Sequence, residues 1–135
     1  MSTDVKTANE TLVESLYESF TTGDLEGVER VMSPDIELHM PRGFANGGAF
    51  RGFDEIVSKV FVRQGKEWEN VSVVPARYVT DGATVIALYT WSGTARATGK
   101  SVEFEGAHVF DFEDGTIVRW TSYADTALFN AALDP

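Results

Sequence analysis

The stretch from Ser101 to Ala124 decides the fold and reads SVEFEGAHVFDFEDGTIVRWTSYA. Side chains of a β-strand alternate between its two faces, so every second residue points the same way. One face of the first half carries Val102, Phe104, Gly106, His108, Phe110 and Phe112. The turn sequence Glu113-Asp114-Gly115 and the strand-like run that follows predict an antiparallel hairpin with one apolar face.

The same period-two pattern extends toward the N-terminus. Trp68 to Thr80 and Ala83 to Ala97 are predicted strands, and Asp81-Gly82 between them is typical of a hairpin turn. Val74-Pro75 interrupts the alternation, which indicates a bulge or a sheet edge. Four consecutive hairpin-linked strands predict a curved, mostly antiparallel sheet.

Helical spacing dominates the N-terminal half, which identifies an α+β fold with three N-terminal helices covering one face of the sheet. The expected elements are a helix over Thr7–Thr21, a short helix capped by Asp24 and ended by Ser33-Pro34, a strand over Asp35–Met40, a glycine-rich loop over Pro41–Gly52, a third helix from Asp54 to Gly65, and a last helix over Thr126–Leu133. Residues 1–135 are expected to form one domain.

Composition excludes several classes of function. The chain has 135 residues, 11 basic and 21 acidic side chains, a formal charge of −10 and no cysteine. It therefore has no disulfide, thiolate metal site or thiol nucleophile, and its charge disfavours nucleic acid as a partner. With neither a leader-like start nor a long apolar run, we expect a cytoplasmic protein that does not engage a membrane. No zinc-binding pattern or nucleotide loop occurs, so no cofactor is expected.

The first candidate site residue is His108, which shares the apolar face with three phenylalanines. A histidine there is either a hydrogen-bonded core residue or a group for proton transfer. The second candidate is Asp125, which ends the last strand. The hairpin turn makes this strand the neighbour of the one that carries His108. Asp125 is either the cap of the last helix or a carboxylate at a pocket mouth. Pairing about the turn places His108 opposite Ser122 or Thr121.

Other polar and aromatic candidates are weaker. His39 alternates with Leu38 and Met40, so we expect it at the rim or surface. Tyr17 lies on the apolar face of the first helix, where a tyrosine is usually a core residue. Trp91, Trp120, Tyr89 and Tyr123 could line an aromatic pocket or simply fill the core.

Three segments resemble a known family: Leu16-Tyr-Glu-Ser-Phe-Thr-Thr-Gly-Asp24, Gly48-Ala-Phe-Arg-Gly-Phe-Asp-Glu-Ile56 and the run from His108 to Thr126. Together they resemble the SnoaL-like branch of the nuclear-transport-factor-2-like superfamily, near the polyketide cyclases and ketosteroid isomerases. The resemblance implies a cone-shaped α+β barrel around a deep pocket, and a homodimer.

The resemblance also implies roles for particular residues. In SnoaL-like cyclases a histidine of the penultimate strand and an aspartate ending the last strand act on a carbon acid, and these positions fall on His108 and Asp125. We expect the substrate to contact Tyr17, Met40, Phe53, Trp91, Phe110 and Trp120. The ketosteroid isomerase base position falls on Met40, and its first-helix tyrosine falls on Leu16, so that mechanism is disfavoured. Limonene epoxide hydrolases use an Arg-x-Asp triplet that this sequence lacks.

The sequence thus favours a cofactor-free acid–base enzyme of the cyclase, isomerase or lyase type, acting on a small hydrophobic carbonyl-bearing or aromatic compound. The main alternative is a non-catalytic ligand-binding or dimerisation module of the same fold. A protein-transport adaptor is a third possibility, which no surface feature of the sequence supports.

Overall fold

The structure is a computed structural model that describes residues 2–45 and 47–135, with side chains from residue 8 onward. Within these residues the helices are α1 (Ser2–Thr22), α2 (Leu25–Arg30), α3 (Phe53–Ile56), α4 (Val62–Glu67) and α5 (Thr126–Leu133), and a π-helical turn, η1 (Val57–Phe61), joins α3 to α4. The strands are β1 (Met32–Met40), β2 (Gly48–Arg51), β3 (Trp68–Asp81), β4 (Thr84–Ala95), β5 (Ser101–Glu113) and β6 (Thr116–Tyr123).

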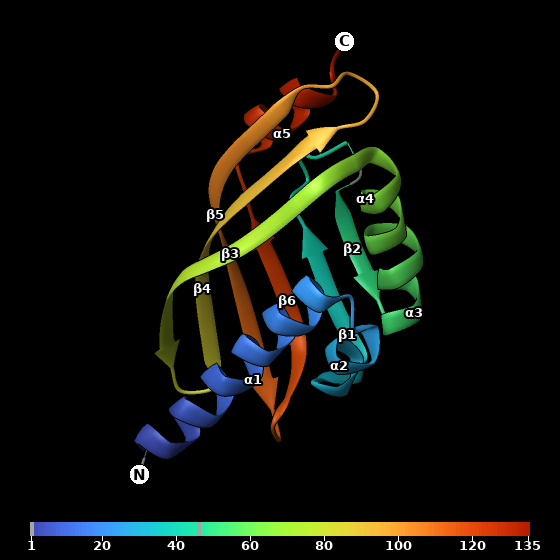
Figure 1. The fold of residues 1–135 in the computed structure, drawn as a ribbon. Helices are drawn as coiled ribbons and strands as arrows, with labels where there is room; N and C mark the ends of the chain where they lie inside the picture. The colour runs from blue at the N-terminus through green and yellow to red at the C-terminus, as the bar shows by residue number, and fades with distance from the viewer. Residues whose placement is uncertain (1, 46) are drawn as a thin grey trace.

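The strands form one curved sheet in the order β2-β1-β6-β5-β4-β3. Among the described strands, β1 and β6 pair in parallel and the other neighbours are antiparallel. Helices α1 to α4 lie along one side of the sheet, and α5 lies at the end of the molecule far from the N-terminus (Figure 1). The predicted α+β fold is confirmed.

The hairpins predicted from turn sequences are present. Gly82, with φ 59°, and Gly115, with φ 80°, take the left-handed backbone conformation that tight hairpin turns need. The bulge expected at Val74-Pro75 is seen as a register shift between Pro75 and Arg77. His108 pairs with Ser122, one of the two partners expected from the turn.

Strand β1 differs from the prediction, because it starts at Met32 rather than Asp35. The expectation that Ser33-Pro34 ends the second helix is wrong, since α2 already ends at Arg30 and Ser33-Pro34 lies within β1. Met32 pairs with Ile117 of β6, and the ladder then shifts register before Glu37. A proline fits at this irregular place because no regular ladder bond is required of its missing N–H.

Two further boundaries differ from the prediction. The loop expected over Pro41–Gly52 contains β2, whose four residues pair with the edge of β1 from Glu37 to Met40; Asn46 of that loop lies outside the described residues. Gly65 does not end the third helix, because the helical segment continues to Glu67. Local glycine content misled both predictions, since pairing with β1 forms β2 and an isolated glycine is tolerated inside a helix.

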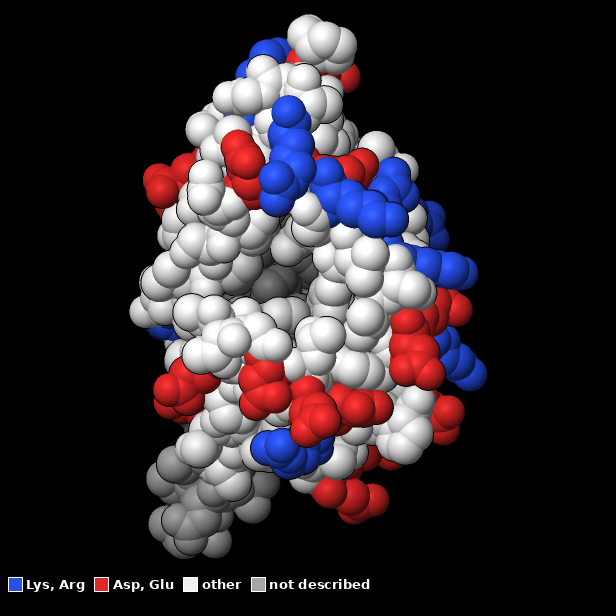
Figure 2. Space-filling model, turned by 45° about the vertical axis from the view of Figure 1, so that its right-hand side comes forward, with Lys and Arg blue, Asp and Glu red and all other residues white. Residues whose placement is uncertain are grey.

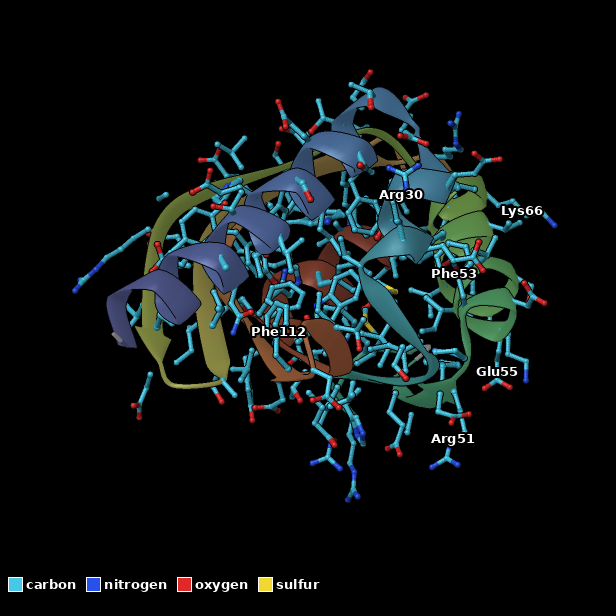
Figure 3. The ribbon with its side chains drawn as sticks, turned by 90° about the horizontal axis from the view of Figure 1, so that it is seen from below. Arg30, Arg51, Phe53, Glu55, Lys66 and Phe112 are labelled. Atoms are coloured by element: carbon cyan, nitrogen blue, oxygen red, sulfur yellow. The ribbon has the colours of Figure 1, made fainter. Side chains whose placement is uncertain are left out.

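The interior contains two hydrophobic clusters. The larger joins α1, α2, α3 and the η1 turn to β1, β4, β5 and β6, and includes Leu16, Ile36, Ile56 and Phe110. Phe112 of this cluster lies between α1 and the sheet (Figure 3). The smaller cluster joins α5 to β3, β4 and β5 around Trp68, Trp91, Phe104 and Phe129. The candidate site lies between the two.

Candidate functional site

A cavity of about 400 Å³ lies between the two clusters and is lined by residues of both. Its wall is largely aromatic: Tyr17, Phe20, Phe44, Phe61, Trp68, Tyr89, Trp91, Phe104, His108, Trp120 and Phe129. Several wall residues are partly or fully exposed, and those at the end of α1, in α4 and in β3, namely Thr21, Gln64, Glu67, Ser72 and Val74, place the mouth beside these elements. Figure 2 shows a hollow on this face, bordered mainly by uncharged residues. A volume in this range suits a small organic molecule.

His108 is the central polar group of the wall. Strand β5 places it on the concave face, and Nδ1 of its ring lies 2.6 Å from the Tyr17 hydroxyl oxygen of α1. The two rings are stacked with centroids 5.9 Å apart. A hydrogen bond this short, across 91 positions of sequence, fixes the imidazole against the first helix.

Two more rings hold the imidazole in place. The ring of Tyr89 stacks on it with centroids 4.2 Å apart, and Trp120 meets it edge-on at 5.3 Å. Burial among these rings lowers the pKa of His108 from 6.5 to about 3. The ring keeps partial exposure although protein surrounds it, because part of its surface faces the cavity.

The Tyr17–His108 pair is therefore neutral at physiological pH. Burial raises the pKa of the Tyr17 hydroxyl far above its usual value of 10.0, so it keeps its proton. Among the described residues no group hydrogen-bonds to Nε2 of His108. In either imidazole tautomer the pair offers one hydrogen-bond donor and one acceptor beyond its internal bond.

A glycine makes room for the hydroxyl of Tyr89. A Cβ at Gly106 would collide with that hydroxyl and with the carbonyl oxygen of Tyr123. The hydroxyl donates to this carbonyl oxygen at 3.3 Å, and burial raises the pKa of Tyr89. Gly106 thus lets Tyr89 lie flat on the imidazole, with buried Ser122 beside them on the wall.

Asp125 lies outside the cavity wall. It is the N-cap of α5, and its Oδ1 accepts a hydrogen bond of 3.0 Å from the backbone N–H of Leu128. The residue is exposed, and it is not among the residues that line the cavity. The structure therefore gives Asp125 the capping position, and a role in proton transfer stays a prediction.

The other predicted contacts divide into two groups. Tyr17, Met40, Trp91 and Trp120 line the cavity, whereas Phe53 and Phe110 do not. Phe110 is fully buried in the larger cluster, and Phe53 packs against the same cluster from the start of α3. Both positions are apolar, but their side chains belong to the packing of the larger cluster.

Two further candidate residues, His39 and Tyr123, lie outside the cavity wall. His39 pairs with Glu37 at 3.1 Å on the outside of β1, as its parity predicted. The expectation that Tyr123 lines an aromatic pocket or fills the core is wrong, because it alternates with the inward Ser122 and is 60% exposed.

Sequence reasoning missed several wall residues. Phe20 and Phe104 lie on predicted apolar faces, whereas Trp68 and Phe129 lie in a predicted strand and a predicted helix whose faces the sequence pattern did not assign to them. Phe61 belongs to the π-helical turn, a rare geometry that shifts the phase of the side chains and that no sequence pattern announced. Gln64 and Glu67 follow this turn and reach the mouth.

The part of the chain that the structure describes shows neither a metal-binding cluster nor a membrane-spanning helix. Among the described residues, no three His, Cys, Asp or Glu side chains are grouped so that they could bind a metal ion. None of the described helices combines the length and the apolar character needed to cross a bilayer.

Comparison with known proteins identifies relatives of the whole fold. The family model of the SnoaL-like domain matches residues 13–120. An NTF2-like protein of Burkholderia thailandensis has 35% identity and a TM-score of 0.90, covering 94% of this chain and 98% of that one. An uncharacterized protein of Mycobacterium tuberculosis is 30% identical over 119 residues, which are 86% of this chain and 88% of the relative.

A third relative was crystallised with a small molecule. TerC, co-crystallised with polyporic acid, has 22% identity and a TM-score of 0.86, covering 95% of this chain and 99% of its own, and this likeness concerns the fold. The helix-lined curved sheet, the enclosed cavity and the family match agree. The chain belongs to the SnoaL-like family of the NTF2-like superfamily.

Proposed function

We propose that this protein binds a small, largely apolar aromatic or carbonyl compound in the cavity and transfers a proton on it through the Tyr17–His108 pair. The observation that carries the proposal is the imidazole of His108, fixed at Nδ1 by Tyr17 and without a hydrogen-bond partner at Nε2 among the described residues. A polar group left unpaired beside an apolar cavity is a natural partner for a ligand oxygen or for a proton.

The proposed step needs only these two side chains. In the tautomer with a proton on Nδ1, that N–H donates to the Tyr17 oxygen, and the lone pair of Nε2 is free. Nε2 takes a proton from the carbon beside a substrate carbonyl, and the electron pair of the broken C–H bond forms the enolate. The Tyr17 hydroxyl donates a hydrogen bond to the enolate oxygen, and Nε2 returns the proton to carbon.

Local charge supports this division of roles. The enolate and the imidazolium form together, so each stabilises the other inside a cavity of low polarity. Tyr17 has a raised pKa and therefore donates a hydrogen bond without losing its proton. The aromatic wall surrounds both groups with largely apolar surface, and the co-crystal of TerC with polyporic acid is consistent with an organic ligand in a related fold.

Exchange of carbon-bound hydrogen tests the proposal. Acetophenone, cyclohexanone and indanone are incubated with the protein in heavy water, and loss of their α-proton signals is followed by NMR. We expect wild type to accelerate exchange of at least one ketone and His108→Phe and Tyr17→Phe to lose most of the acceleration. The matched control is His39→Gln, which removes the histidine outside the cavity and should exchange like wild type. Equal rates in wild type and His108→Phe would overturn the catalytic proposal.

The second candidate is a binding protein without catalysis. It is favoured by one observation, namely that burial moves the pKa values of both His108 and Tyr17 away from neutrality. The same ketones then quench tryptophan fluorescence, since Trp68, Trp91 and Trp120 line the cavity, but no exchange is seen in any variant. Binding with exchange supports the first candidate, and binding alone supports the second.

A further inference from the structure

One carboxylate belongs to the wall of the cavity. Among the described residues that line it, Glu67 is the only acid, and no lysine or arginine lines it. Glu67 is the last residue of α4, and its side chain is 32% exposed at the mouth. The cavity therefore has a negative group at its entrance.

The ion pair of Glu67 leaves part of this carboxylate available. Oε1 lies 3.3 Å from Nε of Arg63, one helical turn earlier, whereas Oε2 has no hydrogen-bond partner among the described side chains. Arg63 does not line the cavity, so the carboxylate is the charge nearer to a ligand there. Carboxylates accept strong, charge-assisted hydrogen bonds from cations.

The remaining cations near the mouth do not reverse this sign. Lys and Arg side chains gather above the hollow in Figure 2. Arg96 is held by the backbone oxygens of Gly65 and Trp68, each 3.1 Å from its Nε, and by Glu69. Lys66 projects away from the body of the molecule (Figure 3). Neither lines the cavity.

The inner end of the cavity, in contrast, suits an uncharged part of a ligand. Its polar groups are the hydroxyls of Tyr17, Tyr89 and Ser122 and the imidazole of His108, all neutral near pH 7. An ionised group placed there would lose its hydration with no opposite charge to replace it. A neutral carbonyl oxygen suits these donors, so a ligand should enter with its carbonyl first.

We propose that Glu67 is a specificity-determining residue that selects ligands carrying a cationic group or a hydrogen-bond donor at the end opposite their carbonyl, and that it rejects ligands with a carboxylate at that end. This inference rests on the proposed function for the position of the carbonyl beside His108, but it does not require catalysis. It assigns the ligand a direction in the cavity and a charge class, namely neutral or cationic aryl ketones.

Three matched probes test the charge class. They are indanone itself, indanone with an aminomethyl group on the benzene ring, and indanone with a carboxylate at the same ring position. Their dissociation constants are measured by tryptophan fluorescence at pH 7 and fixed ionic strength. The proteins are wild type, Glu67→Gln, Glu67→Lys and the control Glu69→Gln. Glu69 is also paired with an arginine and lies two residues further along, but it does not line the cavity.

We expect wild type to bind the cationic probe about tenfold more tightly than the anionic one, as one partly exposed charged hydrogen bond allows. Glu67→Gln should remove most of this preference, Glu67→Lys should reverse it, and Glu69→Gln should retain it. Equal preference in wild type and Glu67→Gln, or equal loss in Glu69→Gln, overturns the inference and assigns the effect to the overall negative charge. If His108→Phe weakens binding of indanone but no charge preference exists, only the inference fails. If no probe binds to wild type, the proposed function fails and the inference falls with it.

Discussion

At the scale of single residues, the account depends on the imidazole of His108. Aromatic rings surround it in the fold, although the residues directly before and after it in the sequence are aliphatic. Alternation along β5 placed His108 on the buried face, and turn counting placed it opposite Ser122, so both were predictable from sequence. Its partner was not, because Tyr17 belongs to a helix 91 positions away. No local pattern reports a contact that depends on how α1 crosses the sheet.

The lowered pKa of His108 predicts acid sensitivity. The unfolded chain binds a proton at this residue below pH 6.5, whereas the folded chain resists protonation down to about 3. The unfolded state therefore holds more protons between these values, and stability falls as pH decreases through this window. From pH 8 to pH 5 we expect wild type to lose up to about 2 kcal/mol of unfolding free energy through this residue. Urea titrations at both pH values measure it.

The control for this measurement is His108→Phe, which keeps an aromatic ring and removes the titrating group. Its baseline stability should be lower, because the Tyr17 hydroxyl loses its partner. Its change between pH 8 and pH 5 should be smaller than that of wild type. The same pH dependence in both proteins would show that His108 is not the residue responsible.

At the scale of elements, strands and helices were predictable where pattern and turn chemistry agreed. Helix α5 spans the predicted residues Thr126–Leu133, because Asp125 caps it and Phe129 and Ala132 pack in the smaller cluster. Strand β2 escaped prediction because its glycine-rich sequence has little strand propensity of its own, and pairing with β1 supplies what propensity lacks. The π-helical turn also escaped prediction, since this geometry is rare and no local sequence signal distinguishes it from an α-helix.

Two substitutions at Asp125 distinguish its role as the cap of α5 from a role in proton transfer. Asparagine caps helices about as well as aspartate, whereas alanine does not. We expect Asp125→Ala to lower the unfolding free energy by about 1 kcal/mol and Asp125→Asn to leave it nearly unchanged. Because the carboxylate is exposed and engaged with Leu128, ketone exchange should survive in Asp125→Asn. Chemical denaturation and the exchange assay measure the two effects, and loss of exchange in a stable Asp125→Asn would restore the proton-transfer role.

At the scale of the whole molecule, the cavity forms where side chains from several helices and strands meet. How these elements are placed relative to one another could not be predicted from the sequence. Each wall residue follows a local apolar pattern, yet α1, the α3–α4 segment, the sheet and α5 must all be placed before the wall exists. The net charge of −10 proved uninformative about the interior. Only one of those acids, Glu67, lines the cavity among the described residues.

The outer face of the sheet carries the prediction of a homodimer. Val79, Leu88 and Tyr123 are 39%, 37% and 60% exposed there, and strand pairing places them side by side with Ile86 and Ala107. An exposed apolar strip of this kind is typical of a contact surface. Sedimentation equilibrium should report a dimer for wild type and a monomer for Leu88→Glu. A monomer for wild type at all concentrations up to the millimolar range would refute the homodimer.

The central claim is that the neutral imidazole of His108, fixed by Tyr17, meets the ligand in the cavity. Nitrogen NMR of protein labelled at its two histidines tests this most directly, with His39→Gln assigning the signals. At pH 7 the account predicts two distinct ring nitrogens for His108, as in a neutral imidazole, and a shift of its Nε2 signal on addition of indanone while His39 stays unchanged. An imidazolium spectrum for His108, or an Nε2 signal that saturating indanone leaves unmoved, would contradict it.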